Sequence, residues 1–269
     1  MVVFPNAKIN IGLNIVEKRQ DGFHNIESCF YPVGWSDALE ILPAKSFSFQ
    51  SDGIHIPGDP AANLCAKAYD MLAADYGFEP VSVYLLKAVP IGAGLGGGSS
   101  DAAFMIKALN ELFRLEISLE KQLDYARRLG SDCAFFIENK PVYCYEKGDR
   151  FEEISLKLEG KWIVLVNPEQ HISTAEAYAG IQPLRSENDL RDLLKKPMES
   201  WKESVKNDFE MSLFPKYPVL KEIKERLYHK GAKYAAMSGS GSTLFGIFEE
   251  ETDLADIFNA YKVWQGYLK

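Results

Sequence analysis

Hydrophobic and polar positions alternate near the start of the chain. From residue 8 to residue 15, isoleucine or leucine occupies every odd position, and lysine, asparagine or glycine occupies every even one. Alternation with a period of two predicts a β-strand, here over residues 8–16. One face of this strand is expected to be buried and the other, which carries Lys8 and Asn10, to be polar.

The remaining pattern predicts a mixture of strands and helices. Strands are predicted at residues 38–42, 46–50, 81–89, 141–146, 162–166, 233–237 and 243–248. Helices are predicted at residues 62–76, 99–113, 119–129, 174–179, 187–194, 199–213, 219–230 and 253–262. Because the two types do not strictly alternate, the pattern favours an α+β fold over a doubly wound parallel sheet.

The length and charge of the chain limit its organisation and its partners. Its 269 residues fit one large domain or two modest ones, and a charge-rich stretch at residues 147–161 predicts a boundary between domains 1–158 and 159–269. With 30 basic and 38 acidic residues, the net charge is −8. An acidic balance argues against a broad basic face for nucleic acid, although a local basic pocket remains open.

Compartment signals favour the cytoplasm. The N-terminus lacks the features of a signal peptide, and no apolar run approaches the ~18–20 residues of a membrane-spanning helix. The four cysteines and four histidines are scattered, without zinc-ligand spacing. Reduced, mostly buried thiols are therefore expected, and no metal site made of cysteine and histidine.

The most distinctive segment is rich in glycine. Residues 90–103 read P-I-G-A-G-L-G-G-G-S-S-D-A-A. Gly92, Gly94 and Gly97 satisfy the G-x-G-x-x-G spacing of a dinucleotide-binding loop, but no second strand ending in an acidic residue follows. A Walker A loop is excluded because Gly98 stands where it needs lysine, and no protein-kinase motifs occur.

The physics common to these loops still applies to the segment. Five glycines within residues 92–98 let the backbone turn so that several N–H groups point at one place. Ser99, Ser100 and Asp101 offer capping groups for the following helix, whose N-terminus carries partial positive charge. We therefore predict a binding site for a polyphosphate, with a flexible glycine turn as the alternative.

Three further features carry candidate chemistry. Lys8 and Asn10 share the polar face of the first strand, where a lysine is usually solvated. Asp132 follows the helix-ending Gly130 and precedes aromatic residues. It is either a site residue or the N-cap of a short helix. The loop at residues 238–242, S-G-S-G-S, is a hairpin connection by default, although such loops also bind phosphate.

Together these segments resemble the GHMP kinase superfamily, small-molecule kinases named after galacto-, homoserine, mevalonate and phosphomevalonate kinases. The resembling blocks follow the family's order across nearly the whole chain, at residues 7–13, 21–28, 94–103, 130–136, 207–210 and 237–242. Two positions depart from the family pattern. Ala134 replaces the usual proline, and Phe23 replaces a tyrosine, which keeps an aromatic face but removes a hydroxyl.

The resemblance implies a fold and a reaction. The fold is a two-domain α+β GHMP kinase fold, with an N-terminal domain like the second domain of ribosomal protein S5 and a ferredoxin-like C-terminal domain. Among GHMP kinases, the blocks most resemble those that act on a cytidine-diphosphate-linked polyol. The implied reaction moves the γ-phosphoryl group of ATP, with Mg²⁺, onto the 2-hydroxyl of a cytidine-diphosphate-linked methylerythritol, in the non-mevalonate route to isoprenoids.

The resemblance also implies residue roles in phosphoryl transfer. Asp132 orients the acceptor hydroxyl and takes its proton, while Lys8 keeps Asp132 ionised and offsets charge on the transferring group. Ser99 or Ser100 reaches the magnesium ion, whose other ligands stay unassigned. The ATP-binding positions are Pro90, Gly92, Ala93, Gly94, Leu95, Gly96, Gly97, Gly98, Ser99 and Ser100, with Gly239, Ser240 and Gly241 in the late loop.

The acceptor side requires aromatic and polar groups for cytosine. Phe23 and Tyr178 are the candidate stacking walls, and His24, Asn10 and Tyr31 are the candidate polar contacts. For each aromatic residue the alternative is core packing. Lys147 is a candidate partner of the diphosphate, with an ordinary exposed lysine as the alternative.

The sequence is compatible with competing functions. Another GHMP kinase, of the homoserine or mevalonate type, has no use for the block at residues 21–28. A non-catalytic GHMP-fold binding protein would be free to lose Lys8 and Asp132. The expected partner is a small molecule, without nucleic acid or membrane, and the protein is expected to be a monomer or a homodimer.

Overall fold

The computed structural model describes residues 1–269, which form two compact units. The first unit contains Met1–Ala7, Trp35–Ile91 and Gly96–Lys140. The second contains Lys8–Gly34, Gly92–Leu95 and Pro141–Lys269. The chain therefore passes between the units several times, and the glycine-rich segment contributes to both.

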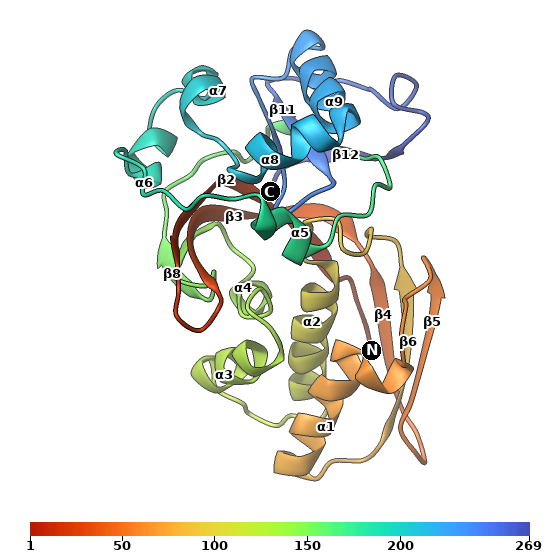
Figure 1. Ribbon diagram of the computed structural model, residues 1–269. Helices are drawn as coiled ribbons and strands as arrows, with labels where there is room; N and C mark the ends of the chain where they lie inside the picture. Colours follow the sequence, from red (N-terminus) through yellow and green to blue (C-terminus); the bar gives the residue numbers. More distant parts are fainter. The chain divides into compact units, whose positions relative to one another are not determined.

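The first unit is a mixed sheet with helices on one face. The strands follow the order β1-β4-β6-β5, with β5 and β6 parallel and the other pairs antiparallel. They are β1 (Val2–Val3), β4 (Ala38–Pro43), β5 (Ser48–Gly53) and β6 (Val81–Lys87). The helical segments are η1 (Pro60–Ala62), α1 (Leu64–Tyr76), α2 (Gly97–Leu112), α3 (Leu119–Leu129) and α4 (Phe135–Glu138). Figure 1 shows α1 and α2 side by side along this sheet, and α2 contacts both α1 and β4.

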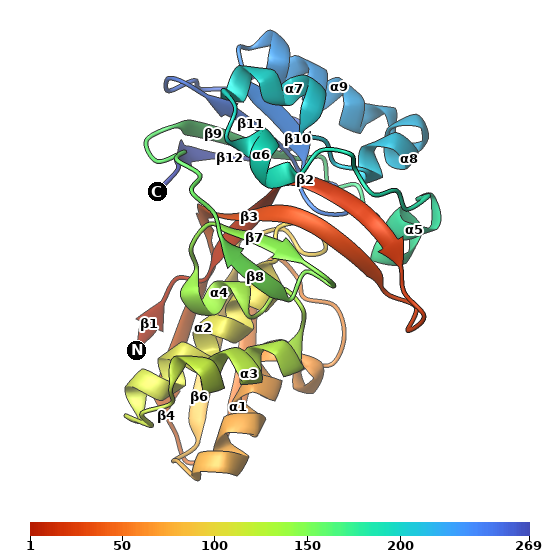
Figure 2. The ribbon, with the colours of Figure 1, turned by 90° about the vertical axis from the view of Figure 1, so that its left-hand side faces the viewer.

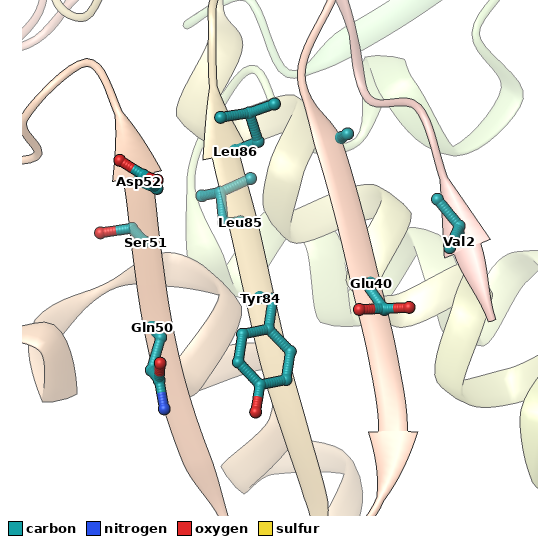
Figure 3. A pocket seen from close by; sticks show the side chains of 9 residues that line it. Val2, Glu40, Gln50, Ser51, Asp52, Tyr84, Leu85 and Leu86 are labelled. Carbon is teal, nitrogen blue, oxygen red and sulfur yellow. The ribbon is translucent and has the colours of Figure 1, made fainter.

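The opposite face of this sheet carries a pocket of about 500 Å³. Its lining comes from all four strands and includes Val2, Glu40, Asp52, Tyr84 and Leu86 (Figure 3). None of the residues that the sequence predicts for the active site lines this pocket.

The second unit contains two antiparallel sheets. The first, in the order β2-β3-β7-β8, comprises β2 (Asn6–Lys18), β3 (His24–Ser36), β7 (Val142–Tyr145) and β8 (Arg150–Glu153). The second, in the order β10-β11-β9-β12, comprises β9 (Trp162–Asn167), β10 (Tyr234–Met237), β11 (Leu244–Phe248) and β12 (Lys262–Tyr267). Figure 2 shows β2 and β3 as a long curved pair.

Short helices complete the second unit. They are α5 (Thr174–Ala179), α6 (Leu190–Leu194), η2 (Met198–Ser200), α7 (Trp201–Ser204), α8 (Phe209–Lys216) and α9 (Pro218–His229). Helix α9 packs on β10 and β11, where it buries Leu220, Ile223 and Leu227. These residues recur at helical spacing, so one face of α9 covers the sheet.

Several predicted elements are confirmed because their ends are fixed locally. Helix α3 covers the predicted residues 119–129, since the Ser118 hydroxyl accepts from the backbone N–H of Lys121 and Gly130 follows the last turn. Helix α1 ends as predicted at Gly77, which adopts the left-handed conformation at φ 61°. The loop at residues 238–242 connects the antiparallel strands β10 and β11, as predicted.

Two predicted helices are wrong. The helix predicted at 199–213 is divided into η2, α7 and α8, because Asn207 and Asp208 use their side chains to hold distant backbone. The helix predicted at 253–262 is a series of turns before β12, which pairs with β9. The strand predicted at residues 8–16 is confirmed as part of β2, and its polar face is also buried, since Lys8 and Asn10 are only 3% and 2% exposed.

The four cysteines are free and buried, as predicted. Among the helices, none combines the length and the apolar character needed to cross a membrane.

Candidate active site

Lys8 and Asn10 are held together on strand β2. Lys8 Nζ donates to Asn10 Oδ1 at 2.6 Å and lies 4.3 Å from the centre of the Phe30 ring. Asn10 Nδ2 in turn donates to Ser28 Oγ at 2.9 Å. An amide oxygen and an aromatic face both favour a positive charge, so the buried lysine is fixed in position by its neighbours.

The loop at residues 238–242, which we call the Gly-Ser loop, lies against the glycine-rich segment. Ser238 Oγ donates to the Gly94 carbonyl at 2.8 Å and accepts from the backbone N–H of Asn10 at 3.2 Å. A Cβ atom on Gly239 would lie 3.1 Å from the Cα atom of Gly94. The two predicted phosphate loops and strand β2 therefore meet within the second unit.

This contact requires glycine at position 94. Its φ is 78°, and a Cβ atom there would lie 1.9 Å from the carbonyl oxygen of Ser238. Both the backbone conformation and the close approach exclude a side chain. Gly92 and Gly96 also have positive φ, of 62° and 69°, so the segment turns sharply, as the glycine pattern predicts.

Asn207 holds the Gly-Ser loop in place through hydrogen bonds of its side-chain amide. Its Nδ2 donates to the carbonyls of Met237 and Gly239, each at 2.8 Å, and its Oδ1 accepts from the backbone N–H of Phe209 at 3.0 Å. Glu210 Oε1 accepts from the backbone N–H of Met237 at 2.8 Å. The sequence block at residues 207–210 thus holds the strand end and the loop, a role that local sequence does not reveal.

Helix α2 begins without a side-chain cap. Its N-cap is Gly96, and no side chain accepts from the first amide groups. The prediction that Ser99–Asp101 cap this helix is wrong, because the helix begins at Gly97 and these residues lie inside it. Uncapped amides at the N-terminus of a 16-residue helix provide partial positive charge and free donors for an anion.

Ser100 adds an unused hydroxyl near this helix end. Its side chain is fully buried, and Ser100 Oγ has no hydrogen-bond partner. A buried hydroxyl without a partner costs free energy, so it indicates a position that binds something else. Ser100 Oγ is therefore an unused hydrogen-bonding group close to the N-terminus of α2.

Asp132 lies in the turn between α3 and α4, two residues after Gly130. The N-cap alternative for this residue is wrong, because the N-cap of α4 is Ala134 and no side chain caps that helix. The Asp132 side chain is half-buried, and the adjacent Cys133 is fully buried, which raises the pKa of that thiol to about 11. Cys133 is therefore an unreactive neighbour of the carboxylate.

His24 and Tyr178 stack on each other. Their ring centres are 4.5 Å apart and their planes differ by 22°. Burial, aided by the charge of Lys18, lowers the pKa of His24, so its ring is neutral at pH 7 and carries one donor and one acceptor nitrogen. The structure thus brings together two of the residues predicted to recognise the base.

Phe23 and Lys147 form a second pair. The Phe23 ring is 60% exposed, and Lys147 Nζ lies 5.3 Å from its centre. Core packing is therefore not the role of Phe23. An exposed aromatic ring with a nearby ammonium offers a flat face and a positive charge to a ligand.

Tyr31 has different contacts from those of these two pairs. It is 2% exposed, and its hydroxyl donates to the carbonyl of Lys269 at 3.2 Å. Burial raises its pKa to about 12. The contact favours the core-packing alternative for Tyr31.

No group of three or more histidine, cysteine, aspartate or glutamate side chains is arranged to hold a metal ion.

Two family models match the chain. The model described as the GHMP kinases N terminal domain matches residues 63–140, and the model described as GHMP kinases C terminal matches residues 187–264. The matches lie on either side of residue 158, where the sequence predicts a domain boundary.

Known proteins extend this similarity over the full chain. A 4-diphosphocytidyl-2-C-methyl-D-erythritol kinase from Cytophaga hutchinsonii is 53% identical over 254 residues, which is 94% of each chain. A crystal structure of a 4-(cytidine 5'-diphospho)-2C-methyl-D-erythritol kinase is 30% identical, with a TM-score of 0.85, and the match covers 99% of this chain and 98% of the other. The mevalonate kinase of Methanococcus jannaschii matches 100% of this chain and 98% of its own, with a TM-score of 0.72 but 15% identity, so it shares the fold alone.

Proposed function

The chain belongs to the GHMP kinase family, and we propose that it transfers the γ-phosphoryl group of ATP to the 2-hydroxyl of 4-diphosphocytidyl-2-C-methyl-D-erythritol. As a member of this family it is an ATP-dependent small-molecule kinase with an α+β fold. The substrate is inferred from the full-length relatives, whose identity is far above that of the mevalonate kinase.

The observation that carries the proposal is the pairing of two glycine loops beside a buried lysine. Phosphoryl transfer asks a protein chiefly for positioning and for stabilisation of charge. The Gly-Ser loop fixes Gly94, and Asn10 fixes Lys8, through contacts of 2.8 and 2.6 Å. This arrangement supports a preorganised site for the phosphates of ATP.

The residues of the phosphate site fit ATP and its metal ion. The uncapped amides of α2 and the turned backbone at Gly92–Gly96 suit phosphate oxygens. Magnesium neutralises charge on the phosphates and usually binds proteins through few side chains. Ser100, whose hydroxyl is unpartnered, is the residue that we assign to hold this ion.

Lys8 and Asp132 supply the chemistry at the acceptor. We assign Asp132 as the group that orients the hydroxyl and accepts its proton, and Lys8 as the group that offsets charge on the transferred phosphoryl. Both assignments follow the family pattern at these two positions. The contact with Asn10 supports the second, because it keeps the Lys8 ammonium in one place.

Recognition of the cytidine is assigned to Phe23, His24 and Tyr178. A base with exposed faces is stabilised by stacking on aromatic rings. The neutral His24 ring offers one donor and one acceptor to the polar edge of cytosine. We assign Lys147, whose ammonium lies beside the Phe23 ring, to the diphosphate.

Calorimetric titration tests this assignment. CDP is expected to bind at least about ten times more tightly than UDP, because the two bases present opposite hydrogen-bonding groups at the polar edge. The His24→Ala variant is expected to lose this preference, while Lys45→Ala, which changes an exposed lysine of the first unit, keeps it. Equal affinity of the wild-type protein for CDP and UDP would refute the cytidine site.

A further inference from the structure

Three buried charged residues surround the ends of the phosphate-binding segment. Lys87 is the last residue of β6, Asp37 precedes β4, and Asp101 lies in α2. Their exposed fractions are 2%, 1% and 3%. Lys87 Nζ donates to Asp101 Oδ2 at 2.8 Å and also to Asp37 Oδ2.

Asp37 holds the backbone that leads into the segment. Its second oxygen, Oδ1, accepts from the backbone N–H groups of Ala88 and Val89 at 2.6 and 2.8 Å. These residues immediately precede Pro90. One carboxylate therefore binds Lys87 and fixes the entry to the glycine-rich segment.

Lys87 also contacts the exit of the segment. A Cβ atom on Gly97 would lie 2.9 Å from Lys87 Nζ, so the ammonium packs directly on the first residue of α2. Gly97 is therefore a glycine because Lys87 needs the space. With Asp101 bound one turn further along, Lys87 holds the start of the helix as well as the entry to the segment.

Stability alone is a weak reason for such a cluster. Removing three charged groups from water carries a large desolvation penalty, and apolar residues of similar volume often replace buried ion pairs without loss of stability. The cluster carries two carboxylates for one ammonium, and burial raises the pKa of Asp101 to about 7. The cluster provides directional hydrogen bonds to both ends of one loop, which apolar packing does not provide.

We propose that Lys87 is a positioning residue for ATP, which sets the separation between the entry and the exit of the segment at residues 90–96 through Asp37 and Asp101. This inference rests on the proposed function, in which that segment binds the ATP phosphates. Lys87 itself is enclosed by its two carboxylates and does not act on the substrate. Its loss alters the spacing of the phosphate-binding amides and therefore weakens ATP binding selectively.

The test is steady-state kinetics on the full-length Lys87→Met protein. Methionine keeps the length and the apolar part of the side chain. We expect the KM for ATP to rise at least about tenfold, while the KM for the cytidine-linked acceptor changes less than about twofold. The matched control is Lys107→Met, a half-buried lysine on α2 whose Nζ lies over the Phe104 ring. Both of its KM values should stay within about twofold of wild type.

A double variant separates positioning from stability. Lys87→Met with Asp101→Asn removes one unpaired carboxylate, so the melting temperature should recover toward wild type while the KM for ATP stays high. Recovery of both would overturn the proposal, because the effect on ATP would then follow from instability. If Lys87→Met does not fold, Asp101→Asn alone decides. This variant keeps the shape of the side chain but loses the ion pair with Lys87. An unchanged KM for ATP in this variant contradicts the proposal.

Different results would refute the proposed function and this inference. If the wild-type protein releases no ADP with ATP and the cytidine-linked acceptor, the function itself is wrong. If the wild type is active and Lys87→Met keeps its KM for ATP, only the role of Lys87 is wrong.

Discussion

The Ser238 hydroxyl donates a hydrogen bond to the carbonyl of Gly94, 2.8 Å away, across 144 positions of sequence. The carbonyl oxygen of Ser238 lies where a Cβ atom of residue 94 would be, at 1.9 Å. The Gly-Ser loop thus fits against the phosphate segment with no space for a side chain. Because the same hydroxyl accepts from Asn10, this contact also joins both loops to the strand that carries Lys8.

Gly94→Ala should abolish this fit. The new Cβ atom clashes with backbone that Asn207 holds in place, so we expect kcat/KM for ATP to fall at least about 100-fold, as for a misplaced catalytic element. The measurement is ADP release at varied ATP concentration.

Gly58→Ala is the control, since Gly58 also has a positive φ, of 98°, but no atom lies within 4 Å of the added Cβ. It should lose only about 1–2 kcal/mol of stability and keep its KM for ATP. Equal effects of the two changes would contradict this interpretation of Gly94.

Lys8→Met should act on the chemical step. The ammonium offsets charge that develops on the transferring group, and loss of one such donor usually lowers kcat about 10²–10³-fold. Stability should change much less than activity, because methionine preserves the contact with Phe30. Single-turnover measurements would report the step directly. A kcat within threefold of wild type would remove Lys8 from the mechanism.

Asp132→Asn tests the proton acceptor. The amide keeps the shape of the carboxylate but cannot take the hydroxyl proton, so kcat is expected to fall about 10²–10⁴-fold. The affinity for the acceptor, measured by calorimetry, should stay within a few-fold of wild type. A fully active Asp132→Asn enzyme would show that the carboxylate does not act as the base.

Asn207→Asp should loosen the Gly-Ser loop. A carboxylate offers no N–H group to the Met237 and Gly239 carbonyls, and two buried acceptors then lose their donor. We expect a loss of about 1–3 kcal/mol of unfolding free energy for each unsatisfied group. Asp208→Asn is the control, because Asp208 Oδ2 accepts from the backbone N–H of Ile15 and an amide oxygen can replace it. Urea denaturation of both variants gives the comparison, and a larger loss in Asp208→Asn would contradict it.

The pH dependence of stability should report on Asp101. Burial raises the pKa of its carboxyl from 3.8 to about 7, although Lys87 opposes the shift. Between these pH values the folded protein keeps a proton that the unfolded chain releases, so this group's contribution to stability falls as pH rises from about 4 to about 7. In Asp101→Asn the contribution is absent. The stability of the wild type relative to this variant should therefore fall between pH 5 and 7, by up to about 1.4 kcal/mol per pH unit, and a constant difference would rule out the shift.

Elements whose ends are set by neighbouring residues could be predicted from the sequence. Ser118 and Gly130 delimit α3 through contacts within a few residues. The helix predicted over 199–213 failed for the opposite reason. Asp208 binds the backbone of Ile15, 193 positions away, and no local pattern signals such a partner.

The same distinction applies to the site. The turned backbone at Gly92, Gly94 and Gly96 follows from glycine content, and the alternation in β2 predicted that Lys8 and Asn10 share a face. Their burial could not be predicted, since it depends on Phe30, Ser28 and Ser238 from other parts of the chain. The cluster of Lys87 with Asp37 was missed because its members are 50 positions apart and each is an ordinary charged residue in sequence.

The central claim is the choice of acceptor, and ADP release across a set of acceptors tests it most directly. The wild-type protein is incubated with ATP, Mg²⁺ and either 4-diphosphocytidyl-2-C-methyl-D-erythritol, mevalonate or homoserine. We predict ADP release with the cytidine-linked acceptor, at a kcat/KM at least about 10³-fold above that with the other two. Turnover of mevalonate or homoserine in preference to the cytidine-linked compound, or of none of the three, would contradict the proposed function.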